Sequence, residues 1–95
     1  MAVKIIIKRR VAKEKEAELL SLLIQLRSLA TAQPGYITGE TLRNMDNPEE
    51  YLVISTWQSL DNWNAWVSGK QRTDVQEKVD ALLGEKSEYD AYLYG

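Results

Sequence analysis

The chain has 95 residues, of which 44% are hydrophobic and 27% charged, as in one small globular domain. Its formal net charge of -2 gives no basic surface for nucleic acid or an anionic membrane, so we expect neither as a partner. Cysteine and histidine are both absent, which excludes disulfides, thiolate chemistry and the commonest ligands of transition metals and haem iron. The acidic residues form no set of metal ligands either, so we expect no bound metal. The length of the chain predicts a single domain over residues 1–95.

The N-terminal segment has too short an apolar run for a secretion signal, and its charges follow that run instead of preceding it. No stretch of the sequence approaches the length of a membrane span. Together with the absence of cysteine, these features indicate a cytoplasmic protein.

Residues 2–9 predict a β-strand, because β-branched residues dominate the segment. Its alternation places Val3, Ile5 and Ile7 on one face. Ile6 falls on the opposite face, which suggests that this second face is also partly covered. A helix is predicted over residues 13–31, where apolar residues recur at three- and four-residue spacing: Leu19, Leu20, Leu23, Leu26, Leu29 and Ala30.

Two further strands are predicted over residues 36–44 and 51–57, with Gly39 weakening the first or marking a bulge. The turn residues Asp46-Asn47-Pro48-Glu49 make these strands an antiparallel hairpin. Ser59 is a favourable N-cap for a helix that ends near Gly69.

The C-terminal part predicts a helix over residues 70–83 and a last strand over residues 88–94. The order β-α-β-β-α-β is the ferredoxin-like arrangement of the α+β class, with helices on one face of a four-stranded antiparallel sheet. The uncovered face would need a partner, and a face-to-face homodimer is the simplest way to cover it.

Three motifs resemble the antibiotic biosynthesis monooxygenase (ABM) family of dimeric α+β barrel proteins. They are Gln33-Pro34-Gly35-Tyr36, Asp46-Asn47-Pro48-Glu49-Glu50-Tyr51, and Trp57-Gln58-Ser59 followed by Trp63 and Trp66. The resemblance covers nearly the whole chain in the right order. It implies a barrel made by the sheets of two subunits, and a pocket between sheet and helices in each subunit.

The family includes haem-degrading monooxygenases, to which the chain is similar at Trp57, Ser59 and Trp66. The pocket tryptophan of that branch falls on Trp66, and its haem-ligating histidine falls on Gln76. Its first-strand asparagine falls near Ile7 or Lys8. Glutamine is a poor iron ligand, so the resemblance does not extend to haem degradation, and no cofactor is expected.

The family also includes cofactor-independent oxygenases that act on polycyclic phenols or quinols. Their strand tryptophan falls on Trp57, their pocket tyrosine on Trp63 and their asparagine on Val53. Their helical arginine falls near Glu77 or Lys78. By this comparison the chain retains the aromatic lining of these oxygenases but lacks their polar pocket residues.

Trp57, Trp63 and Trp66 predict an aromatic wall for a flat ligand, since the last two are neighbours on one helical face. Packing in the core or at a dimer interface is the alternative for all three. With Gln76 they are the candidate substrate-binding residues, and the catalytic residues stay unassigned.

Other polar residues have a functional and a plain interpretation. Asn62 and Asn64 either orient a substrate hydroxyl or are exposed on a helix, and Arg27 and Arg43 either bind an anion or are solvated. Three tyrosines are expected to pack in the barrel or at the interface: Tyr89, Tyr92 and Tyr94.

The leading hypothesis is a cofactor-independent monooxygenase that acts on a small aromatic or quinol-like compound, which supplies its own electrons to oxygen. The main alternative is a non-catalytic binding or regulatory module on the same fold. A haem-binding protein is the third.

Overall fold

Strand β1 (Val3–Arg10) lies inside a four-stranded antiparallel sheet, between β3 (Glu50–Trp57) and β4 (Tyr89–Leu93). Strand β2 (Tyr36–Arg43) pairs with β3 at the other edge, so the order is β2-β3-β1-β4. This computed structural model describes residues 1–94. The predicted ferredoxin-like fold with a four-stranded antiparallel sheet is confirmed.

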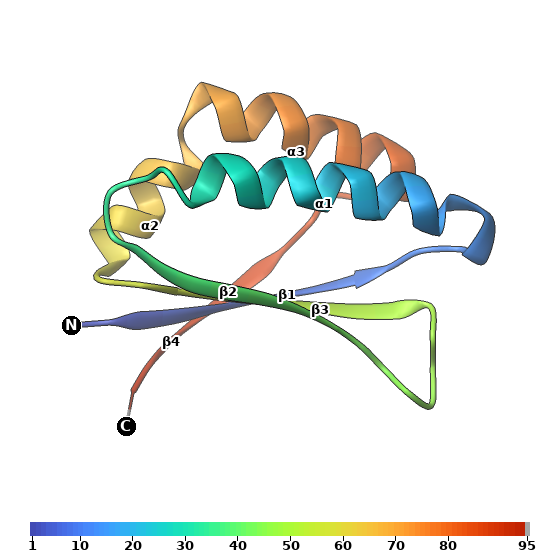
Figure 1. Ribbon diagram of the computed structural model, residues 1–95, viewed down its shortest axis with the longest axis horizontal. Helices are drawn as coiled ribbons and strands as arrows, with labels where there is room; N and C mark the ends of the chain where they lie inside the picture. The colour runs from blue at the N-terminus through green and yellow to red at the C-terminus, as the bar shows by residue number, and fades with distance from the viewer. Residues whose placement is uncertain (95) are drawn as a thin grey trace.

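The helices cover one face of this sheet (Figure 1). A short 3-10 helix (Lys13–Lys15) leads into α1 (Glu16–Ala30), and β3 is followed by α2 (Leu60–Val67) and α3 (Lys70–Leu83). The predicted break near Gly69 is therefore confirmed, and the helical segment before it is a separate short helix. Among the described residues no helix is both long and apolar enough to cross a membrane.

The helix-facing side of β1 carries the expected residues Val3, Ile5 and Ile7, all buried. Arg9 continues the same alternation and is only 3% exposed. A charged side chain in this position is unusual, because burial of an unpaired charge is costly.

The helix-facing core consists of two clusters of buried side chains. The tryptophan cluster comprises Val3, Ile5, Ile7, Ala30, Trp57, Trp63 and Trp66. The leucine cluster comprises Val11, Leu19, Leu22, Leu23, Tyr51, Val75 and Val79. Leu22 was not among the predicted core positions, and it is buried because α3 also packs against α1. The half-buried side chains of Leu26, Leu29 and Val53 contact both clusters.

The start of α2 is held by the predicted N-cap. The Ser59 hydroxyl accepts a hydrogen bond from the Asn62 backbone N–H at 3.1 Å and donates one to Asn62 Oδ1 at 2.6 Å. These bonds satisfy a backbone donor that the helix itself leaves free. Asn62 therefore has a structural role at the beginning of the helix.

The turn at Gly35 is fixed against this same cap. Gly35 has a φ of 84°, and its carbonyl accepts a hydrogen bond from the Gln58 backbone N–H at 2.8 Å. A side chain at this position would collide with the side chain of Asn62. Glycine is thus required by both the backbone conformation and the close approach.

The comparison of Gly35→Ala with Gly84→Ala separates these two requirements. Both glycines have a positive φ, but a Cβ at Gly84 would have no neighbour within 4 Å. We expect Gly84→Ala to lower the free energy of unfolding by about 1–2 kcal/mol and Gly35→Ala by about 2–5 kcal/mol. Urea unfolding of the two variants measures the difference, and equal losses would contradict the proposed collision.

Candidate functional site

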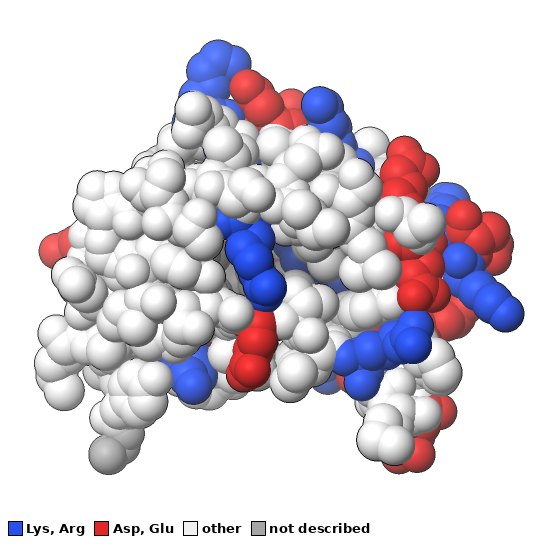
Figure 2. Space-filling model, in the orientation of Figure 1, with Lys and Arg blue, Asp and Glu red and all other residues white. Residues whose placement is uncertain are grey.

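A cavity of about 70 Å³ lies between the sheet and the helices. At ~10–15 Å³ for each water position it has room for about five to seven waters, which at ~30 Å³ each occupy the volume of a one- or two-ring aromatic molecule. Its walls come from β1, β2, β3 and all three α-helices. In Figure 2, which has the orientation of Figure 1, the surface is hollowed near the centre of the view, and basic and acidic side chains lie at the edge of this hollow.

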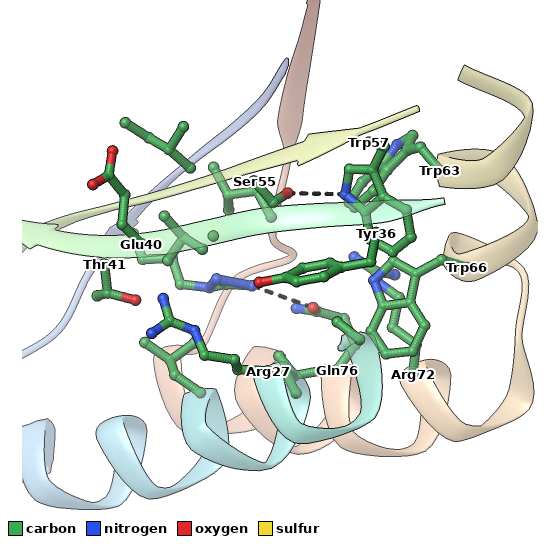
Figure 3. Close-up of a pocket in the computed structure, with 18 residues that line it drawn as sticks. Arg27, Tyr36, Glu40, Thr41, Ser55, Trp57, Trp63, Trp66, Arg72 and Gln76 are labelled. Carbon is green, nitrogen blue, oxygen red and sulfur yellow. Dashed lines mark hydrogen bonds between the residues drawn. The ribbon is translucent and has the colours of Figure 1, made fainter. Parts of the chain in front are cut away.

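One wall of the cavity is aromatic and is organised around Trp57 (Figure 3). The ring of Trp66 stacks on that of Trp57, with centroids 6.2 Å apart and an interplanar angle of 24°. Trp63 and Tyr36 meet Trp57 edge-on, at 5.7 and 5.4 Å. The Trp57 indole donates a hydrogen bond to Ser55 Oγ at 3.1 Å, which fixes its orientation.

Tyr36 enters this wall because the backbone of β2 makes room for it. The pairing of β2 with β3 is irregular between Tyr36 and Thr38, whereas Gly39 pairs normally with Ser55. The bulge considered at Gly39 therefore lies earlier in the strand, between Tyr36 and Thr38. A Cβ at Gly39 would lie 2.7 Å from the Tyr36 hydroxyl oxygen, so this glycine leaves the space that the phenol occupies.

The opposite side of the cavity is polar. Arg9 donates a hydrogen bond to Gln76 Oε1 at 3.2 Å, and Gln76 Nε2 donates one to Asp80 Oδ1 at 2.9 Å. The same Asp80 oxygen accepts a bond from the Ser87 backbone N–H at 3.0 Å. Both ends of the Gln76 amide are therefore engaged, and Gln76 holds the Arg9 guanidinium in place.

Burial changes the acid–base properties of these groups. Desolvation and the nearby Arg72 lower the pKa of Arg9 to about 10, although Asp80 opposes this change. The Arg9 guanidinium is still positive at neutral pH. Burial also acts to raise the pKa of Asp80, but its hydrogen bonds with Gln76 and Ser87, together with Arg9, lower that pKa below its ordinary value.

Two further arginines border the cavity. Arg72 lies over the ring of Trp63, with its guanidinium carbon 5.7 Å from the ring centroid, and burial lowers its pKa. Arg27 projects from α1 and is exposed. Glu40 on β2 is the only acid among the lining residues of the described chain, and it too is exposed.

A family model described as antibiotic biosynthesis monooxygenase matches residues 2–78 of this sequence, which includes the strand, turn and helix residues of the cavity. The chain belongs to this family. All the residues that line the cavity lie within this matched segment of the ABM chain.

Two curated relatives of the ABM chain come from Streptomyces. The 42.8 kDa protein in the whiE locus of Streptomyces coelicolor is 27% identical over 64 residues, which cover 67% of this chain and 16% of the relative. Protein SchA of Streptomyces halstedii is 22% identical over 68 residues, covering 72% and 18%. The chain thus spans less than a fifth of the length of these relatives.

Solved structures with the same fold are more distant in sequence. A conserved protein from Methanosarcina mazei superposes with a TM-score of 0.91 at 18% identity, covering 100% of this chain and 94% of the other. SnoaB, a cofactor-independent oxygenase from Streptomyces nogalater, gives 0.88 at 20% identity, covering 99% and 93%. At this identity the likeness concerns the fold.

The four candidate substrate-binding residues of the ABM chain all border the cavity: Trp57, Trp63, Trp66 and Gln76. The three tryptophans are at most 6% exposed. They are therefore both core and cavity wall, and the two interpretations left open by the sequence do not exclude each other.

Of the other polar candidates, only one borders the cavity. Arg27 borders the cavity, whereas Arg43 lies outside it and forms an ion pair with Glu16 at 2.8 Å. Asn64 is exposed, and Asn62 serves the N-cap. Of the C-terminal tyrosines, Tyr89 packs edge-on against Trp63 with centroids 5.0 Å apart.

Only some of the positions that were compared with functional residues of the family border the cavity. Val53 borders the cavity, and on the first strand it is Ile7 that does so, not Lys8. Glu77 and Lys78 are exposed and do not border it.

Arg9 and Arg72 border the cavity but were not singled out from the sequence, and Tyr36 was noted only as part of a turn motif. Arg9 follows Val3, Ile5 and Ile7 in strict alternation, which was a usable signal for its buried position. The orientation of Tyr36 depends on the irregular β2 pairing, and that of Arg72 on the packing of α2 and α3. The motif that contains Tyr36 does not indicate where its ring points, and nothing in the sequence marks Arg72.

Asp80→Asn tests the polar side of the cavity through the pH dependence of stability. The folded-state pKa of Asp80 lies below the unfolded value of about 3.9, so its charge stabilises the fold above pH ~4. This contribution is lost as the pH falls through the folded-state pKa. We expect Asp80→Asn to be less stable than the parent protein at pH 7, with the difference shrinking towards pH 3.

Asp74→Asn is the matched control, because it removes the same formal charge from an exposed position of the same helix. Urea unfolding at both pH values gives the comparison. If the two variants behave alike at pH 7, the Arg9-Gln76-Asp80 chain of hydrogen bonds does not contribute to stability.

Proposed function

We propose that this protein is a cofactor-independent monooxygenase of the ABM type, acting on a small aromatic or quinol-like compound. The observation that carries this proposal is the cavity with its wall of Trp57, Trp66 and Tyr36. Flat aromatic rings pack favourably against such a wall. The description of SnoaB as a cofactor-independent oxygenase gives further support.

A quinol needs no cofactor to react with oxygen, because it supplies the electrons itself. A ring carbon of a quinol gains one oxygen atom from O2 and the product is a hydroxyquinone. The second oxygen atom leaves as water with two hydrogens of the substrate. The protein then has to bind the ring, exclude water and orient the reacting carbon.

The side chains of the cavity suit these tasks. Trp57 and Trp63 are 1% and 2% exposed, so they close the inner end of the cavity to solvent. In Figure 3 the Tyr36 hydroxyl points away from Trp66, towards the side of the cavity where the Gln76 amide lies. The Tyr36 hydroxyl offers a polar partner for an oxygen atom of a bound ring, whereas the Gln76 amide is already engaged by Arg9 and Asp80.

A non-catalytic binding module is the second candidate, and one observation favours it. Glu40 is the only carboxylate among the described lining residues, and its exposed position does not suit a general base. For haem binding the donor set is poor, since Gln76 uses its amide oxygen for Arg9 and its amide nitrogen for Asp80.

We further propose that residues 1–95 form one ABM domain that pairs with a second copy. The family model ends at residue 78, but β4 completes the sheet beyond it. The sheet face away from the helices has partly exposed apolar side chains in a row, among them Ile6, Leu52 and Ile54. Leu42 and Tyr92 extend this row and are 46% and 53% exposed.

Oxygen uptake with a panel of benzene and naphthalene quinols tests the catalytic proposal. We expect uptake above the spontaneous rate. We expect Trp66→Ala to reduce kcat/KM by about tenfold or more, because it removes a stacking surface. Leu60→Ala is the control, since this exposed residue of α2 does not border the cavity.

The circular dichroism spectrum of each variant is compared with that of the parent protein. Binding of the quinols without any uptake by a folded protein would favour the binding module. Equal reductions of kcat/KM in the Trp66 and Leu60 variants would show that the quinol does not react in this cavity.

Light scattering during size exclusion tests the homodimer. We expect the parent protein to have about twice the chain mass of 10.9 kDa and Ile6→Glu to shift it towards the monomer. Ile24→Glu makes the same chemical change at a site 66% exposed on the outer side of α1 and should stay dimeric. A monomeric parent protein at micromolar concentration would refute the face-to-face pairing.

A further inference from the structure

The Arg9 guanidinium is a buried charge without an acidic contact. Arg9 is 3% exposed, and its Nε is buried without a hydrogen-bond partner among residues 1–94. Its bond to a protein side chain goes to the neutral amide of Gln76. Asp80 reaches it only through that amide.

A charge in this position costs stability unless an anion compensates it. An apolar residue would fill the same place on β1 at less cost, as Val3, Ile5 and Ile7 do. A free donor on a buried guanidinium is therefore a binding group that the fold itself does not use.

The charge balance of the cavity points the same way. Its lining contains three arginines, Arg9, Arg27 and Arg72, against one acid, Glu40, which gives a formal charge of 3 − 1 = +2. Glu40 and Arg27 are both exposed, so solvent screens them. Arg9 and Arg72 are the more deeply placed charges, and Asp80 behind Gln76 only partly offsets them.

The aromatic wall and the buried charge border one space. Tyr36, Trp57 and Trp66 form one side, and Gln76, which holds Arg9, forms the other (Figure 3). A ligand that satisfies both sides has a flat ring and an anionic group at its edge. Guanidinium and carboxylate groups match in geometry, because the guanidinium presents parallel N–H donors.

A phenol does not meet this requirement at neutral pH, since its ordinary pKa is about 10 and it remains uncharged. We propose that the ligand of this cavity is an aromatic carboxylate whose acid group binds Arg9. This inference rests on the proposed aromatic ligand and specifies its class, whether or not the ligand is oxidised.

Calorimetric titration with 2-naphthoate and 2-naphthamide tests the inference without involving oxygen. The two probes have the same ring system and nearly the same shape, but only the first is an anion. We expect the parent protein to bind 2-naphthoate at least about tenfold more tightly than 2-naphthamide, the difference expected of a charge-assisted hydrogen bond.

Arg9→Gln should abolish this preference while leaving the affinity for 2-naphthamide nearly unchanged. Arg10→Gln is the matched control, because its side chain is 67% exposed on the opposite face of the same strand. It removes the same net charge and should keep the preference. Arg9→Lys keeps the charge and should retain part of it.

Equal affinity for the two probes in the parent protein would overturn the inference and leave the aromatic site standing. That comparison remains decisive even if Arg9→Gln fails to fold. Loss of the preference in Arg10→Gln as well would also overturn it, since bulk charge would then explain the effect. Tight binding of 2-naphthoate without oxygen uptake by any quinol would support the inference and contradict the catalytic proposal.

Discussion

The burial of one indole ring, that of Trp57, holds the functional end of the molecule together. Trp57 is the last residue of β3, and its ring meets Tyr36 from β2 and both tryptophans of α2. Truncation of a buried aromatic side chain typically costs about 3–5 kcal/mol, a large part of the stability of a small domain. The turn at Gly35 and the cap at Ser59 place the flanking elements where this ring can contact them.

The cavity exists because the two halves of the core do not merge completely. Ile7 belongs to the tryptophan cluster and Val11 to the leucine cluster, and Arg9 lies between them on β1. Gln76 and Asp80 then form a polar strip inside an otherwise apolar layer. Apolar side chains in the same place would cost the core less, and this cost is the basis of the ligand class proposed above.

Most of the fold follows from local sequence patterns. Alternation gave the strands, and the turn residues, the Ser59 cap and the break at Gly69 gave the boundaries to within one or two residues, except at α1, which begins after a 3-10 turn. Less of the site could be predicted from the sequence. The tryptophans stand out by residue type, whereas Arg72 and Tyr36 reach the cavity only through tertiary packing. Gln76 was considered as a replaced iron ligand, and its contact with Arg9 links positions 67 residues apart.

The concentration of tryptophan has a spectroscopic consequence. The protein has three tryptophans, and all of them lie in the cavity wall, with Trp57 in contact with the other two. Its tryptophan emission therefore originates entirely at the cavity wall, where a ligand would bind. The stacked indoles of Trp57 and Trp66 also form a coupled pair of chromophores. Near-ultraviolet dichroism of the unlabelled protein thus monitors this wall directly, with no background from indoles elsewhere.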